Sequence, residues 1–283
     1  MLPVFKDLLF AVKKNKAVRI FLYPYCTAKR NRQTNKYINS DFSRNISQWK
    51  DKYKGKRCFI IGNGPSLTAG DLELLKANGE ITFASNRIYH IYDCTDWRPD
   101  FYVAFEREFC RTNADMISSI EVRSARFLNL VAWSRERESS STFWLNCTSK
   151  YISEKLTKKN IEFSDDISVC VNDAYSVTYT MLQLAVYMGF GEIVLLGVDH
   201  YEKRNPDMPE HFYGNKRGEY RTPTYLEGIE CGYVLADEEA RKRGVNIYNA
   251  TRGGQLEVFK RTDFDSMFGN RMKSEDKCQE IYI

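Results

Sequence analysis

Two short apolar runs constrain this chain most strongly, because each is apolar at every position and each stops at a glycine. Cys58–Ile61 precedes Gly62, and Ile193–Leu196 precedes Gly197. Strands that are apolar on both faces are typical of a parallel sheet that helices cover on both sides. Segments with a helical pattern stand between the predicted strands, as that architecture requires. The sequence therefore predicts an α/β fold with a mostly parallel sheet and helices on both faces.

The alternation of strands and helices along the chain is Rossmann-like. Strands are expected at 57–62, 81–85, 101–105, 126–131, 142–145, 167–171, 192–197 and 245–248, and helices at 68–78 and 174–188. We expect three parts: a basic amphipathic N-terminal segment over 1–55, a catalytic domain over 56–268 and a polar tail over 269–283. Ligands of such sheets bind at the carboxyl ends of the strands, so candidate site residues are sought there.

The first strand end carries the sequence Gly62-Asn63-Gly64-Pro65-Ser66. Its glycines permit a close approach of the backbone. We expect the amides of Asn63, Gly64 and Ser66, together with the N-terminus of the next helix, to point at one anion such as a phosphate. The stretch lacks the Gly-Lys-Ser/Thr of a Walker A loop and the third glycine of a GxGxxG motif. Taken alone, it also fits an ordinary tight turn.

Polar side chains follow several other predicted strands. The densest group is an acid, an imidazole and a phenol that come directly after the apolar run ending at Gly197. Each residue by itself fits a structural role as well as a functional one, but together they favour a pocket for a nucleotide or a nucleotide sugar. The candidate residues at these strand ends, together with His211 and Tyr213 of the long segment after Tyr201, are Asn86, Arg87, Glu106, Asp199, His200, Tyr201, His211, Tyr213, Asn249, Arg252 and Gly253.

Positive charge is concentrated at the N-terminus. The whole chain has a net charge of +5, whereas residues 1–57 contain fifteen Lys and Arg against three Asp, hence +12. Apolar residues interleave with the lysines from Leu2 to Leu22. This pattern is typical of a helix at a membrane surface and equally of a helix packed on the main domain. Both interpretations stay open: peripheral contact with an anionic membrane, or docking on the domain. No nucleic-acid motif follows, so no nucleic-acid partner is expected.

The remaining composition bears on location and cofactors. No apolar stretch approaches the ~20 residues that cross a bilayer, and no signal-peptide cleavage site is present. The eight cysteines include no CxxC, and we expect reduced thiols in a cytoplasmic protein, with the inner face of the membrane as a peripheral location. Asp263-Phe-Asp265 does not follow a buried run, and no His/Cys cluster stands out, so neither a metal nor a cofactor is expected.

The motifs in this order resemble the MptE-like superfamily. They are IIGNGPSL, ASNRIY, RPDFYVAFE, MGFGEIVLLGVD and GVNIYNATRGG, which span roughly Lys56 to Phe259. That superfamily contains archaeal hydroxymethyl-dihydropterin pyrophosphokinases and motility-associated flagellin glycosyltransferases. The same order of elements is similar to that of bacterial sialyltransferases of the lipooligosaccharide type.

The likeness to the sialyltransferases implies roles for individual residues. The nucleotide-binding positions of that family fall on Asn63, Gly64, Ser66 and Asn86. The tyrosine that contacts the leaving phosphate there corresponds to Tyr201.

Two motifs depart from the sialyltransferase pattern. Ser176-Val177-Thr178 stands where those enzymes hold the sugar carboxylate with threonine-serine-glycine. Of their His-Tyr-Ile-Gly-His run, this chain keeps the first histidine as His211 but has Asn215 in place of the catalytic second one. Sialic acid as the donor sugar is therefore an open question.

A transferase of this kind deprotonates an acceptor hydroxyl and stabilises a departing phosphate. A histidine with a pKa near ~6.5 suits the first task. We expect His211 to be the base, with His200 as the second choice and Asp199 as orienter or base. Tyrosine hydroxyls and arginines suit the second task. The residues expected to do this are Tyr201, Tyr213, Arg87 and Arg252.

Three functions remain open. The first is a glycosyltransferase that uses a nucleotide-activated sugar, such as a CMP-linked sugar acid, on a glycan or lipid-linked acceptor in bacterial surface polysaccharide synthesis, without a metal. The second is a pyrophosphokinase that uses ATP and Mg²⁺ on a pterin-type alcohol. The third is a non-catalytic nucleotide-binding scaffold. The basic N-terminal segment favours the first, because a soluble pterin gives no reason for a membrane-facing patch. The sequence leaves donor, acceptor, linkage and oligomeric state open.

Overall fold

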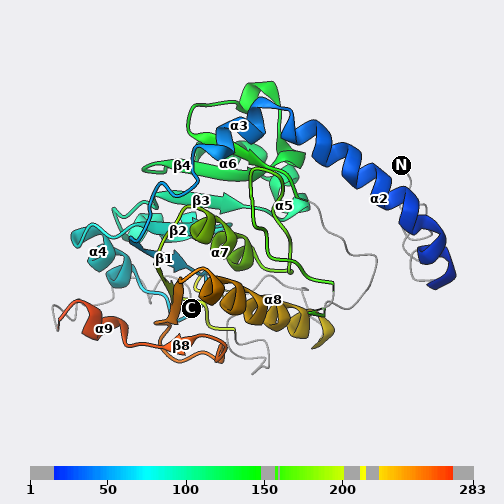
Figure 1. Ribbon diagram of the computed structural model, residues 1–283. Coiled ribbons are helices and arrows are strands. Elements are labelled where there is room, and N and C mark those ends of the chain that lie inside the picture. The colour runs from blue at the N-terminus through cyan, green and yellow to red at the C-terminus, as the bar shows by residue number, and fades with distance from the viewer. Residues whose placement is uncertain (1–15, 148–156, 159, 201–210, 215–222, 270–283) are drawn as a thin grey trace.

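The computed structural model describes residues 16–147, 157–158, 160–200, 211–214 and 223–269 (Figure 1). In this part of the chain, eight strands form one sheet in the order β5-β4-β3-β2-β1-β6-β7-β8, and every neighbouring pair is parallel. The predicted Rossmann-like α/β fold is confirmed. The strands are β1 (Arg57–Ile61), β2 (Thr82–Ser85), β3 (Phe101–Ala104), β4 (Ala125–Asn129), β5 (Thr142–Leu145), β6 (Glu192–Leu196), β7 (Asn246–Asn249) and β8 (Lys260–Arg261).

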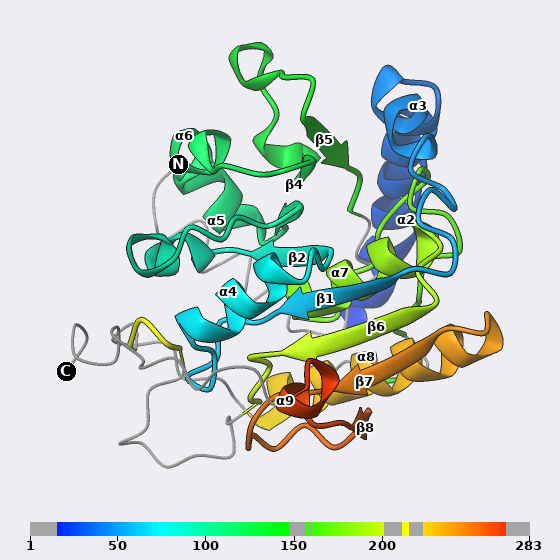
Figure 2. The same cartoon turned by 90° about the vertical axis from the view of Figure 1, so that its left-hand side faces the viewer.

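Helices cover both faces of the sheet (Figure 2). Because side chains alternate along a strand, Cys58 and Ile60 of β1 point into one core, while Phe59 and Ile61 point into the other. The first core is closed by α3 (Asp41–Ser47), α7 (Val177–Tyr187) and α8 (Pro223–Lys242). The second is closed by α4 (Ala69–Ala77), the 3₁₀ helix η1 (Ile88–Cys94), α5 (Arg107–Thr112), α6 (Ala114–Ser119) and α9 (Phe264–Met267). Two 3₁₀ turns, η2 (Leu130–Ala132) and η3 (Arg135–Arg137), flank β4 and β5.

The strand order reverses between β1 and β6. From β1 the chain builds the sheet outward as far as β5, then returns through α7 to place β6 on the other side of β1. In open parallel sheets the crevice for a ligand lies outside the carboxyl ends of the two strands at this point. The fold therefore directs attention to Gly62–Ser66 after β1 and Gly197–His200 after β6.

Residues before Lys56 share the core of the sheet. Trp49 meets the rings of Phe101, Phe127 and Phe143 edge-on, with centroids 5.6, 5.5 and 5.1 Å away. At the end of α2 (Lys16–Ile38), the Tyr37 hydroxyl donates to the carbonyl oxygen of Trp144 at 2.8 Å. The end of α2 and all of α3 therefore seal the β5 side of the sheet. No helix within the described residues is both long and apolar enough to cross a bilayer.

Two sequence-based expectations about secondary structure are wrong. Residues 167–171 form no strand beyond an isolated bridge between Cys147 and Val171. A turn replaces the strand, because the Asp166 carboxylate accepts the backbone N–H of Ser168 at 2.9 Å. No helix is expected after residue 188, yet α8 begins at Pro223, since proline is well tolerated in the first turn of a helix.

The cysteine expectation fails at one position. Cys94 is disulfide-bonded, whereas Cys58, Cys110, Cys170 and Cys231 are thiols. Spacing in the sequence cannot show which segments bring two sulfurs within bonding distance, and this depends on tertiary structure.

The packing of Trp49 leads to a stability prediction. Trp49→Ala should lower the free energy of unfolding by about 3–5 kcal/mol, the range for truncating a buried aromatic side chain. Urea denaturation followed by circular dichroism measures this. The matched control is Trp133→Ala, whose indole is 42% exposed and should cost about 1 kcal/mol or less. Equal stability losses in the two variants would contradict the placement of Trp49 in the core.

Candidate functional site

The ends of β1 and β6 approach each other closely enough to demand glycine. The Gly62 N–H donates to the carbonyl oxygen of Leu196 at 2.8 Å, and the Gly64 N–H donates to that of Gly197 at 2.8 Å. A Cβ on Gly62 would lie 2.2 Å from the carbonyl oxygen of Gly197. No side chain fits at that separation, so the two strand ends depend on the glycine.

Asp199 packs into the turn that follows β1. A Cβ on Gly64 would lie 1.8 Å from Oδ2 of Asp199, and the Ser66 hydroxyl donates to the same oxygen at 2.8 Å. Asp199 is buried, with only 3% of its surface exposed. The predicted turn residues and the predicted strand-end aspartate therefore form one unit.

The predicted anion contact is smaller than the sequence suggests. The amide of Gly64 is not available, because it donates to Gly197, and that part of the prediction is wrong. The amides of Asn63 and Ser66 make no hydrogen bond within the described part of the chain, and Pro65 has no N–H to offer. The first turn of α4 begins later and is capped by its own Thr68 and Asp71. The Ser66 hydroxyl already donates its proton to Asp199, so two amides remain for an anion.

Two asparagine oxygens lie buried beside the turn. The Asn63 side-chain amide donates to the carbonyl oxygen of Ser85 at 3.1 Å, which fixes its Oδ1 on the opposite side. Neither Oδ1 of Asn63 nor Oδ1 of Asn86 has a hydrogen-bond partner among the described residues. An acceptor buried without a donor costs free energy. A ligand hydroxyl or amino group would supply the missing donor.

The short segment 211–214 is attached to the turn. The Phe212 N–H donates to the carbonyl oxygen of Asn63 at 3.0 Å. The ring of His211 stacks on Tyr213 with centroids 4.9 Å apart, and Tyr213 meets His90 at 5.1 Å. The structure thus brings His211 and Tyr213 to the strand ends, as a site containing both would require.

His90 is a site neighbour that the sequence interpretation missed. It lies in η1, four residues after Asn86, and its imidazole pKa is lowered by burial and by the charge of Arg87. A neutral imidazole near pH 7 follows. Its position shortly after β2 could have marked His90 as a candidate site residue, but no sequence pattern predicts its contact with Tyr213.

His200 faces α8 rather than the turn. Its Nε2 lies 3.4 Å from a carboxylate oxygen of Glu230, and its ring meets that of Tyr233. The Tyr233 hydroxyl is in turn 2.9 Å from the Ser176 hydroxyl at the start of α7. His200 and Ser176 therefore belong to a network that joins β6, α7 and α8, while Thr178 is buried in the first turn of α7. Tyr201 lies outside the described residues.

The glycine-rich loop after β7, residues 250–255, holds the backbone around Asp199 in place. The Gln255 N–H donates to the carbonyl oxygen of Asp199 at 2.7 Å, and the Thr251 hydroxyl accepts the N–H of Val198 at 3.0 Å. The Asn249 side chain is bonded locally, donating to the carbonyl oxygen of Leu256 and accepting from the N–H of Thr251. Gly253 lies in this loop and its carbonyl accepts from Arg261. These contacts position the end of β6.

Arg252 is ion-paired with two carboxylates. Its guanidinium donates to Asp71 at 2.7 and 2.8 Å and to Asp265 at 2.7 Å. The side chain thereby ties the exit loop to α4 and α9. Of the two arginines expected to offset phosphate charge, Arg252 is occupied by these pairs, and Arg87 lies over the ring of Phe109 at 5.8 Å.

Glu106 ends the third strand and caps α5. Its carboxylate accepts the backbone N–H groups of Glu108 and Phe109. Asp173, which the sequence interpretation missed, lies near enough that the charge of Glu106 adds to burial in raising the pKa of its carboxyl group. Glu106 therefore has a structural role at this edge and an acidic neighbour beside it.

Comparisons with known proteins identify the family. The family described as 6-hydroxymethylpterin diphosphokinase MptE-like matches residues 32–205. The chain belongs to this family. Comparison with curated proteins gives no match.

Two solved structures give the structural comparison. One is the MAf glycosyltransferase from Magnetospirillum magneticum AMB-1, with 20% identity, a TM-score of 0.49, and coverage of 80% of this chain and 38% of that one. The chain thus spans well under half the length of that enzyme. The other is a short-chain dehydrogenase from Oenococcus oeni PSU-1, with 12% identity, a TM-score of 0.25, and coverage of 76% and 87%.

The geometry of Gly64 gives the second prediction. Gly64→Ala should lower affinity for nucleotide by at least about tenfold, because the methyl group displaces Asp199 and distorts the turn, while overpacking costs only about 1–3 kcal/mol of stability. Isothermal titration measures the affinity, and circular dichroism confirms the fold. The matched control is Gly79→Ala, where no atom lies within 4 Å of the added Cβ but the φ of +65° strains an alanine, so stability falls without any contact with the turn. Unchanged affinity in Gly64→Ala would show that the turn serves only to reverse the chain.

Proposed function

We propose that this protein is a nucleotide-dependent transferase, and that it transfers a sugar from a nucleotide-activated donor. The observation that carries the proposal is the unit formed by Gly62–Ser66 and Asp199 at the point where the strand order reverses. Backbone amides at such a point are suited to phosphate oxygens. The amides of Asn63 and Ser66 are the groups we assign to the donor phosphate.

The buried asparagine oxygens support a nucleoside beside that phosphate. Oδ1 of Asn63 and Oδ1 of Asn86 need hydrogen-bond donors, and a nucleoside offers hydroxyl and amino groups. A phosphate oxygen cannot fill this need, because it only accepts. The nucleoside is therefore assigned to the ends of β1 and β2.

The chemistry is assigned to segment 211–214. His211 takes the proton of the acceptor hydroxyl, and the Tyr213 hydroxyl donates to the departing phosphate. Tyr201 is proposed for the same phosphate contact from its likeness to the sialyltransferases. The acceptor is a glycan or lipid-linked sugar, and the donor a nucleotide sugar such as a CMP-linked sugar acid. No metal takes part in this mechanism.

A second candidate is diphosphate transfer from ATP to a pterin-type alcohol, the activity in the family's description. One observation favours it. The carboxylate of Asp199 stands directly beside the turn, where a phosphate would meet its negative charge unless a cation lay between them. Mg²⁺ is commonly bound through one or two carboxylates together with substrate phosphates. No cluster of three His, Cys, Asp or Glu side chains occurs in the described ranges, so Asp199 is the residue that would hold the ion.

A nucleotide panel separates the two candidates. Isothermal titration with CMP, UDP, GDP and ATP, each with and without Mg²⁺, should show binding of a pyrimidine or guanine nucleotide independent of the ion. Slow hydrolysis of the matching nucleotide sugar should accompany it. Binding of ATP alone, and only with Mg²⁺, would instead establish the diphosphokinase. Failure of all four nucleotides to bind would refute both.

The catalytic assignment is tested on two histidines. His211→Ala should lower turnover by roughly 10²–10⁴-fold with donor affinity nearly unchanged, the usual consequence of losing an acid–base group. His200→Ala should lower turnover less and reduce thermal stability instead, because His200 contacts Glu230 and Tyr233 of α8. Initial rates and thermal melts of both variants measure this. A larger kinetic effect from His200→Ala would move the base to the end of β6.

A further inference from the structure

Helix α2 has one face bound to the domain and one face open. Tyr37 bonds to Trp144, and the side-chain amide of Gln33 donates to Asn146 at 3.4 Å, so this side of the helix is fixed on the β5 edge. The opposite side is exposed. Figure 1 shows α2 running outward from α3 beyond the sheet. The helix is thus held rigidly while it projects one long surface to its surroundings.

The open face is strongly cationic. The α2 sequence contains six Lys and Arg and no Asp or Glu. Lys29, Arg32 and Lys36 are exposed and form no ion pair within the described part of the chain. Some cations elsewhere are paired, as Arg57 is with Glu80 and Arg243 with Asp165, and others such as Lys54 and Arg111 are not paired within the described ranges. What distinguishes α2 is that its basic residues share the helix with no acidic residue, so Lys29, Arg32 and Lys36 can meet an external anion.

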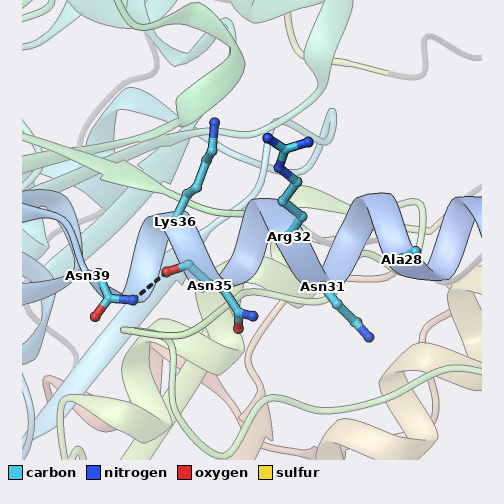
Figure 3. A pocket seen from close by; sticks show the side chains of 6 residues that line it. All are labelled: Ala28, Asn31, Arg32, Asn35, Lys36 and Asn39. Atoms are coloured by element: carbon cyan, nitrogen blue, oxygen red, sulfur yellow. Dashed lines mark hydrogen bonds between the residues drawn. The ribbon is translucent and has the colours of Figure 1, made fainter.

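The cations share their face with amide and apolar side chains. This open surface of the helix includes Ala28, Asn31, Arg32, Asn35, Lys36 and Asn39. Figure 3 shows Arg32 and Lys36 leaving the helix on the same side. Tyr25 stands seven residues before Arg32, hence on the same stripe of the helix, and is 66% exposed.

We infer that this face of α2 binds the surface of an anionic membrane. Lipid phosphates attract lysine and arginine, with each basic residue near the surface adding to the affinity. The headgroup region also accepts an aromatic ring such as that of Tyr25. The open face thus offers both components of interfacial binding, and the contact on β5 would hold the sheet domain next to the lipid. The inference does not depend on which reaction the protein catalyses.

Vesicle binding of the full chain tests the inference. The protein should sediment with vesicles of phosphatidylcholine and phosphatidylglycerol and should remain in solution with phosphatidylcholine alone. Arg32→Glu/Lys36→Glu should lower the partition coefficient by at least about tenfold. Raising the ionic strength should weaken binding of the unaltered chain, because salt screens surface charge. Thermal melts check that the variant remains folded.

The matched control changes the net charge equally at another place. Lys54→Glu/Arg111→Glu reverses two exposed cations outside α2 and should leave vesicle binding within about twofold of the unaltered chain. An equal loss in both variants would mean that net charge alone governs sedimentation, and it would overturn the assignment to α2. Absence of binding to anionic vesicles, or α2-dependent binding to single-stranded RNA in its place, would also overturn it.

Discussion

The contact between the turn after β1 and the end of β6 is the constraint on which the rest of the site depends. Two hydrogen bonds between the strand ends draw them together, and the Asp199 side chain occupies the space that a Cβ on Gly64 would need. Because β1 and β6 are the neighbours at which the strand order reverses, this contact forms at the point where open parallel sheets bind their ligands.

Loops that are distant in sequence serve this contact from two directions. The exit after β7 supports Asp199 through Gln255 and Thr251, and Arg252 ties that loop to α4 through Asp71. From the other side, Phe212 joins segment 211–214 to the turn, which brings His211 and Tyr213 to the strand ends. The polar residues after the strands therefore form two groups. Those of the exit loop after β7 hold Asp199 and the turn in place, and those of segment 211–214 lie beside the turn.

The N-terminal helices are attached to the core of the sheet. The aromatic contacts of Trp49 make the residues before β1 part of the core, so α2 is fixed at one end. Lys29, Arg32 and Lys36, which form no ion pair within the described residues, then lie on a helix attached to the core. A face held in this way can bind a surface without ordering a flexible segment first, which lowers the entropic cost of association.

The sequence by itself determined the parallel α/β sheet, most strand positions and the turn at Gly62–Ser66, because apolar runs and glycines are local signals. Tertiary structure alone decided the rest. The amide of Gly64 is used by Gly197, Arg252 is bound by two carboxylates, and His90 joins Tyr213 across more than a hundred residues. Residues 167–171 have the apolar content of a strand but turn at Asp166 instead. Each outcome depends on which partner the fold brings within hydrogen-bonding or packing distance, and residue spacing along the chain does not contain that information.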